Sequence, residues 1–137
     1  MTAKSVMNDQ ERQQWLRQQY QTATKFLADK GLVTKSFSES DSRYVVPLVS
    51  VWKVNLIDNS SVWVIAGDLP SDSSPYNVAS DAREALRHFA LKWQLQAENI
   101  LRTGTVDQKP YANILISRSE GLYDLVEKEE LWETEVA

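Results

Sequence analysis

Apolar residues recur every three or four positions from residue 9 to residue 30, which predicts an amphipathic helix. Asn8 can cap this helix, and Glu11 can bond back to the cap, as in a capping box. Gly31 can adopt the left-handed conformation that ends a helix, and Leu32 can then fold back onto the last turn. The apolar positions of this helix are Trp15, Leu16, Tyr20, Ala23, Phe26 and Leu27.

The next apolar pattern is β-branched and aromatic, and it predicts a hairpin of two strands over 44–57 and 61–67. Pro47 cannot donate to a ladder, so it marks an edge position or a break between two short strands. The polar stretch 34–42 precedes this hairpin, and Phe37 is its one large apolar residue. We predict that this stretch is a loop.

A turn centred on Asn59 and Ser60 sets the expected register of the hairpin. This register pairs Trp52 with Gly67, which leaves room for the indole ring. It also places Trp63, and Ile65 after it, on the same face as Trp52. We therefore expect one continuous core face on this hairpin.

Residues 67–75 are predicted to be a loop, because Asp68 and Pro70 both disfavour sheet pairing. The longest amphipathic pattern follows and predicts a second helix from about residue 80 to residue 102. Asp81 is a suitable N-cap for it, with an acidic residue three positions later.

Leu91 and Leu95 widen the apolar face of this second helix, so we expect more than half of its circumference to be buried. Gly104 is its predicted end. A third helix is expected to start near Pro110, because proline is tolerated in the first turn. Gly121 interrupts its pattern, which predicts a bend or a break at that position.

These elements give the order α-β-β-α-α, an α+β fold. A small antiparallel sheet built on the 44–57/61–67 hairpin is expected to pack against three helices. The sequence does not decide whether a third strand joins this sheet. At 137 residues, the chain is expected to form a single globular domain over 1–137 with frayed tails at 1–7 and 133–137. Because a small sheet leaves an edge that can pair with another chain, a homodimer or another protein partner is a further hypothesis.

Composition narrows the range of functions. The net charge of −4 and the pI near 5.0 disfavour binding to nucleic acid or to an anionic membrane. The absence of cysteine excludes a thiol nucleophile and a cysteine-ligated metal. No apolar run is long enough to predict a membrane span. The basic residues Arg83, Arg87 and Lys92 are expected to pair with the acidic C-terminal segment.

The candidate chemistry lies around the predicted start of the second helix. Glu84 and His88 are four residues apart and so share one helix face. A carboxylate beside an imidazole is the minimum for metal binding or general-base chemistry, and Asp68 or Asp72 could add donors. The alternative is a solvated helix pair, which the sequence favours because one such pair is a weak signal. The predicted ligand-binding residues are Asp68, Asp72, Glu84, Arg87 and His88, with no metal site and no cofactor.

Two other features have two interpretations each. The turn at 67–70 is either a ligand loop directed at a helix N-terminus or a structural turn, and its residue types favour the turn. Trp132 is either an interface anchor or the last residue of a helix folded back on the body.

A resemblance to a known family rests on the run from Trp63 to Pro70 followed by the run from Ala82 to Glu98. The Trp15 helix and the segment from Leu122 to Leu125 extend it. With these residues, the chain resembles a bacterial family of short uncharacterised proteins defined only as a domain of unknown function. The resemblance implies a bacterial cytosolic domain, and it implies no particular activity, substrate or catalytic residue.

These observations predict a cytoplasmic bacterial protein that acts as a non-catalytic protein-binding or adaptor module. Its partners are predicted to include neither nucleic acid nor a membrane. The alternative is a small-molecule- or metal-binding enzyme that uses Glu84 and His88 with Asp68 and Asp72. The sequence leaves open whether the protein is an enzyme.

Overall fold

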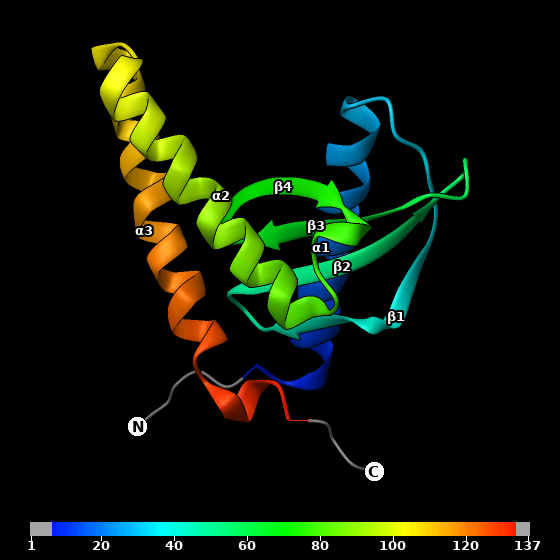
Figure 1. Ribbon diagram of the computed structural model, residues 1–137. Coiled ribbons are helices and arrows are strands. Elements are labelled where there is room, and N and C mark those ends of the chain that lie inside the picture. The colour runs from blue at the N-terminus through cyan, green and yellow to red at the C-terminus, as the bar shows by residue number, and fades with distance from the viewer. Residues whose placement is uncertain (1–6, 134–137) are drawn as a thin grey trace. The chain divides into compact units, whose positions relative to one another are not determined.

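The computed structural model describes residues 7–133 of the 137-residue chain (Figure 1). The chain divides into two compact units, one that ends at Pro75 and one that begins at Tyr76. We call them the sheet unit and the hairpin unit. The element order is α-β-β-β-β-α-α, and the predicted α+β class is confirmed. Apart from Met7 and Glu133, the predicted tails lie outside the described residues.

The sheet unit contains one helix and a four-stranded antiparallel sheet with the strand order β1-β2-β3-β4 (Figure 1). Each strand therefore pairs with its neighbour in the chain. The elements are α1 (Asp9–Asp29), β1 (Thr34–Val45), β2 (Val49–Leu56), β3 (Ser61–Gly67) and β4 (Leu69–Pro75).

Both ends of α1 follow the sequence prediction. At the start, the Glu11 amide donates to the Asn8 side chain at 2.8 Å, and the Asn8 amide donates to the Glu11 carboxylate at 3.1 Å. At the end, Gly31 has a φ of 82°, and the Leu32 amide donates to the Leu27 carbonyl at 2.9 Å. This reversal returns Leu32 to the core of the sheet unit.

The face of the sheet that α1 covers is apolar. Ala23 and Leu27 of α1 pack with Trp52, Val54 and Leu56 of β2, all of them buried. Successive residues of a strand alternate between the two faces, so β2 presents its even-numbered residues to α1.

Two predicted loops are strands. The polar stretch 34–42 belongs to β1, and residues 69–75 form β4, so both predictions were wrong. These are the two edge strands of the sheet, where one side needs no ladder partner. An edge strand tolerates polar residues and proline, which explains why Pro70 does not end the sheet.

The predicted register of the β2–β3 hairpin was also wrong. Trp52 pairs with Val64, and Lys53 pairs with Trp63, so Trp63 lies on the opposite face from Trp52. The loop contains Asn59 at a φ of 72°, and the Leu56 amide donates to the Ser60 carbonyl at 2.8 Å. The loop is therefore longer than a two-residue turn, and the odd shift in register exchanges the faces.

Pro47 marks a break, as one reading of the sequence predicted. The turn at 46–48 separates β1 from β2. Gly67 lies opposite Val49 and close to the backbone of Leu48, whose carbonyl accepts from the Asp68 amide at 2.9 Å. The prediction that Gly67 makes room for Trp52 is therefore wrong, because the close neighbour of Gly67 is backbone.

The hairpin unit consists of α2 (Ala82–Thr103) and α3 (Lys109–Val126), which pack along each other (Figure 1). Short 3-10 turns lie at Tyr76–Val78 (η1), Val106–Gln108 (η2) and Glu129–Leu131 (η3). The Asp81 side chain caps α2, accepting from the Glu84 amide at 2.9 Å, and Gly104 ends this helix. The predicted break at Gly121 is absent, because α3 continues through that residue.

α2 is less buried than predicted. Leu91 and Leu95 are 50% and 57% exposed, so they do not extend the core face. The helix buries a stripe of seven residues, and its other side faces solvent. The buried residues are Ala82, Ala85, Leu86, Phe89, Ala90, Trp93 and Ala97.

The last turn of α3 is held by Arg83, which pairs with the acidic C-terminal segment as the charge pattern predicted, whereas Arg87 pairs with Glu84 instead. Arg83 donates to the Val126 carbonyl at 2.7 and 2.9 Å, and it pairs with Glu129 at 3.0 Å. The Trp132 indole donates to the Leu125 carbonyl at 3.0 Å, so Trp132 folds back onto the helix. Among the described residues, no helix is long and apolar enough to cross a membrane.

Candidate functional site

The sheet unit carries a groove of about 750 Å³ between α1 and the strands β1 and β2, open to solvent along one side. One face of α1 forms one wall, because its contributing residues are spaced three or four positions apart. Aromatic residues dominate the rest of the lining. The groove is lined by Gln13, Leu16, Arg17, Tyr20, Phe37, Glu39, Tyr44 and Trp52.

Four aromatic rings from three elements gather in this groove. Trp52 is central: its ring centroid lies 4.8 Å from that of Tyr44, 5.0 Å from that of Phe37 and 6.2 Å from that of Tyr20. Tyr20 and Phe37 are 4.3 Å apart. Trp52 is buried and forms the floor, whereas Tyr20 is 44% exposed at the rim. The groove therefore offers solvent-accessible aromatic surface on a buried base.

The polar atoms of the floor are already bonded within the fold. The Trp52 indole N–H donates to the Ser50 hydroxyl at 2.7 Å, and that hydroxyl donates to the Ala66 carbonyl at 2.8 Å. Ser50 is fully buried, so this chain replaces water for both groups. A molecule in the groove therefore meets Trp52 mainly as an apolar ring.

An irregularity in β1 brings Phe37 and Tyr44 to the same face. In a regular strand, residues seven positions apart point to opposite faces. From Ser38 to Arg43, β1 advances five residues while β2 advances two, from Lys53 to Val51, so β1 contains three extra residues. This odd number reverses the alternation, and Phe37 and Tyr44 both lie on the face of Trp52.

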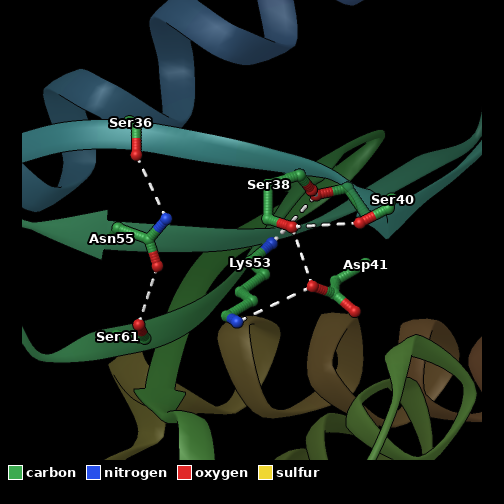
Figure 2. A network of polar contacts seen from close by, with 8 residues as sticks. Ser36, Ser38, Ser40, Asp41, Lys53, Asn55 and Ser61 are labelled. Carbon is green, nitrogen blue, oxygen red and sulfur yellow. Dashed lines mark hydrogen bonds and ion pairs between the residues drawn. The ribbon is translucent and has the colours of Figure 1, made fainter.

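A polar network holds these extra residues in place (Figure 2). The Ser42 hydroxyl donates to the Ser38 carbonyl at 2.7 Å and accepts from the Lys53 amide at 3.0 Å. Asp41 accepts from the Ser38 hydroxyl at 2.7 Å and lies 3.6 Å from the Lys53 ammonium. Side chains thus supply the hydrogen bonds that the interrupted ladder loses.

A second set of polar contacts crosses the sheet (Figure 2). Asn55 donates to the Ser36 hydroxyl at 3.1 Å and accepts from the Ser61 hydroxyl at 2.8 Å, so it joins β1, β2 and β3. Asn55 and Lys53 are odd-numbered residues of β2 and lie on the opposite face from Trp52. The polar face therefore positions β1, and the other face of β1 lines the groove.

The surroundings of Tyr44, in the lining of the groove, favour its neutral phenol form. Burial raises the pKa of the Tyr44 phenol above its ordinary value of 10.0, and the Glu39 carboxylate raises it further. A hydrogen bond with Ser42 and the charge of Arg12 lower this pKa and partly offset the rise. Arg17 and Glu39, on opposite walls, place one charge of each sign at the exposed rim.

Comparison with protein families matches residues 9–132 of the chain to the family described as Domain of unknown function (DUF4826). The chain belongs to this family. The resemblance found in the sequence is thereby confirmed, and the match spans both units. No curated protein and no solved structure matches the chain.

In this DUF4826 protein, three of the five predicted site residues come together in the hairpin unit. Glu84, Arg87 and His88 border a shallow hollow of about 310 Å³ with Leu91 and Tyr123. The Arg87 guanidinium lies 3.3 Å from the Glu84 carboxylate. A positive charge at that distance disfavours a cation on Glu84, so this trio is a poor metal site.

The other two predicted residues, Asp68 and Asp72, belong to the sheet unit. Asp68 follows the close approach at Gly67, and its amide bonds to the Leu48 carbonyl. Asp72 lies within β4 and accepts from the Ser73 amide at 2.8 Å. Their local contacts are those of a turn and a strand. Across residues 7–133, no three acidic or histidine side chains gather in a geometry that would hold a metal ion.

The groove residues of the DUF4826 chain were not predicted as a site. Tyr20 and Trp52 were assigned to the core, and Phe37 was assigned to a loop. A usable signal was present: Phe37 and Tyr44 flank a run rich in serine and acidic residues, which is the composition of an interrupted edge strand.

Proposed function

We propose that this protein is a non-catalytic protein-binding module, and that the aromatic groove holds an apolar side chain of a partner protein. The observation that carries the proposal is the four-ring cluster of Tyr20, Phe37, Tyr44 and Trp52 at an open groove. Tyrosine and tryptophan at a surface contribute much of the contact energy of protein interfaces.

The shape and chemistry of the groove favour a protein segment over a small substrate. Small-molecule sites enclose most of their ligand, whereas this groove is open along one side. Its floor presents an apolar indole whose N–H is already bonded. The opposite charges of Arg17 and Glu39 can orient a segment that crosses the groove. An apolar anchor side chain with polar flanks fits these features.

The test is affinity capture from a bacterial lysate with three versions of the full chain. The groove variant carries Arg17→Glu and Tyr20→Ser, which alter exposed rim positions. The control carries Gln18→Ala on the same helix, at an exposed residue that does not line the groove. The wild type and the control are expected to capture a stoichiometric partner. The groove variant is expected to capture at least about tenfold less of that partner.

Two results would contradict the proposal. Equal capture of a partner by all three versions would place binding on another surface. The absence of any stoichiometric partner of the wild type would remove the protein-binding function. Circular dichroism of each version, with melting temperatures within a few degrees, establishes that a loss of capture reflects the groove and not unfolding.

The alternative of a small-molecule-binding enzyme rests on one observation, the hollow bordered by Glu84, Arg87 and His88. Arg87 and His88 could bind an anionic ligand there. Calorimetric titration with inorganic phosphate, for the wild type and for His88→Ala, tests it. Binding that His88→Ala abolishes would favour this alternative, and no heat in either protein would remove it.

We also propose that the protein works in the bacterial cytosol. The absence of cysteine and the acidic composition support this location. Fractionation of cells that produce the protein at its native level tests it, and recovery in the membrane or secreted fraction would contradict it.

A further inference from the structure

α2 carries a stripe of six residues on the side opposite its buried residues; four of the six are exposed, and Glu84 and His88 are half-buried. Their spacing alternates between four and three positions, which is the period of helices that pair along their length. The two central residues, Leu91 and Leu95, are at least half exposed. The stripe consists of Glu84, His88, Leu91, Leu95, Glu98 and Arg102.

Two copies of this stripe have complementary side chains when the copies run in opposite directions. If two copies of α2 run antiparallel about a point between Leu91 and Leu95, Leu91 of each copy lies opposite Leu95 of the second copy. The same register places Glu84 opposite Arg102, which carry opposite charges. It also places His88 opposite Glu98, where an imidazole N–H can donate to a carboxylate.

The flanking residues do not oppose this pairing. In the same register, Arg87 lies opposite Asn99, and Lys92 lies opposite Gln94, so no like charges meet. A parallel, in-register pair would instead place Glu84 opposite Glu84 and Arg102 opposite Arg102. Charge therefore selects the antiparallel arrangement over the parallel one.

The hollow in the hairpin unit provides a place for part of the second copy. It is bordered by Glu84, His88 and Leu91 of the stripe and by Tyr123 of α3. Antiparallel pairing brings the second half of the other stripe, which begins at Leu95, over this hollow. On each side of the two-fold axis that relates the copies, an apolar side chain can thus be buried between two helices.

We propose that this stripe of α2 is a self-association surface, on which a second copy of this chain packs antiparallel with Leu91 opposite Leu95 and Glu84 opposite Arg102. This surface is distinct from the aromatic groove, and the inference does not depend on the proposed function. One helix face per copy is a small contact, so the dimer is expected to be weak and to form at high protein concentration.

The natural absence of cysteine permits a direct test of the register. Full-length Glu84→Cys and Arg102→Cys variants are prepared separately, mixed and oxidised. The mixture is expected to form a disulfide-linked heterodimer, whereas Glu84→Cys alone is expected to stay monomeric. In the antiparallel register, the two copies of residue 84 lie about 27 Å apart along the helix axis. Gln96→Cys, an exposed residue of α2 outside the stripe, is the matched control.

Cross-linking of Glu84→Cys to itself would overturn the antiparallel register. Cross-linking no greater than that of the Gln96→Cys control in every mixture would overturn the surface altogether. These variants leave Leu91 and Leu95 in place, and circular dichroism of each variant before oxidation verifies that it is folded.

Sedimentation velocity over a range of concentrations tests the charge pairing without cross-linking. Arg102→Glu places like charges opposite Glu84 and is expected to weaken dimerisation about tenfold. The double variant Glu84→Arg, Arg102→Glu restores opposite charges and is expected to recover the wild-type dimer within about threefold. A wild-type protein that stays monomeric at all concentrations, or a double variant weaker than Arg102→Glu, would contradict the proposal.

Discussion

Gly67 shows how one residue controls the geometry of the sheet unit. Its φ of 154° is unfavourable for other residues, and a Cβ there would lie 2.8 Å from the Val49 Cα and closer still to the Leu48 carbonyl oxygen. These neighbours are backbone atoms that cannot move aside. Gly67→Ala is therefore expected to lower the free energy of unfolding by about 2 kcal/mol or more, measured by urea denaturation.

Gly121 is the matched control for that change. It lies exposed within α3, and a Cβ there would meet nothing within 4 Å. Because alanine is the better helix former, Gly121→Ala is expected to stabilise the protein by up to about 1 kcal/mol. Equal effects of the two substitutions would show that the close approach at Gly67 is not a constraint.

Tyr44 reports on the electrostatics of the groove. Its pKa is raised above 10.0, by burial first and by Glu39 second, so the folded protein favours the neutral phenol. Stability is therefore expected to be retained below pH 10.0 and to fall as the pH rises from there through the folded-state pKa. A difference absorbance titration against Tyr44→Phe measures this pKa, and Glu39→Gln is expected to lower it. An unchanged pKa in Glu39→Gln would exclude a contribution from Glu39.

At the scale of the element, the irregularity in β1 is what makes the groove. Ser42 bonds to both Ser38 and Lys53, so removing its hydroxyl takes one hydrogen bond from a part-buried carbonyl and one from a part-buried amide. Ser42→Ala is expected to lower the free energy of unfolding by about 1–3 kcal/mol, measured by urea denaturation. It is also expected to reduce partner capture, because Phe37 and Tyr44 would no longer be held on one face.

Ser40→Ala is the control for Ser42→Ala. Ser40 is exposed and contacts the Ser38 hydroxyl at 3.5 Å, so its loss is expected to change stability by less than about 0.5 kcal/mol. If Ser42→Ala were no more destabilising than Ser40→Ala, the side-chain bridge would not be what maintains the irregularity.

The C-terminal end of α3 depends on Arg83 of α2. Arg83→Ala removes two charge-assisted bonds to the Val126 carbonyl and is expected to lower the midpoint of thermal or urea unfolding. Arg83→Lys is expected to recover only part, because an ammonium lacks the planar fork of donors. Full recovery by lysine would show that charge alone is responsible.

The ion pair between Arg83 and Glu129 also predicts that the stability of the protein depends on pH. The hydrogen bond and charge of Arg83 hold the pKa of Glu129 below its ordinary value of 4.5. The contribution of the Glu129 carboxylate is therefore present above pH 4.5 and is lost as the pH falls below it. Glu129→Gln is expected to remove this acid-dependent part, measured as the stability difference between near-neutral and acidic pH.

The elements that the sequence predicted correctly are those with strong local signals. The capping box at Asn8, the glycine end at Gly31 and the Asp81 cap all lie within a few residues of the groups they bond. The two edge strands were missed because their pairing comes from distant residues, and local composition there resembles a loop. The register failed for a different reason: the loop around Asn59, which has a positive φ, is longer than the predicted two-residue turn, and the odd shift exchanges the faces.

At the scale of the molecule, the α+β class and the family membership followed from the sequence, but the groove did not. The groove requires α1, β1 and β2 together, and its rings come from residues as far apart in the chain as Tyr20 and Trp52. The predicted site residues were chosen for their charged or metal-ligating side chains, in one helix and in the segment before it. Such local reasoning finds paired charges more readily than an aromatic surface assembled by a strand irregularity.

The most direct test of the groove as the binding surface is to map the bound surface by changes in amide and indole NMR chemical shifts. The captured partner is titrated into the labelled full-length protein. Binding in the groove predicts that the shift changes concentrate at the Trp52 indole, at α1 from Gln13 to Tyr20 and at β1 from Phe37 to Tyr44. Shifts confined to the hairpin unit, with Trp52 and Phe37 unchanged at saturation, would contradict it.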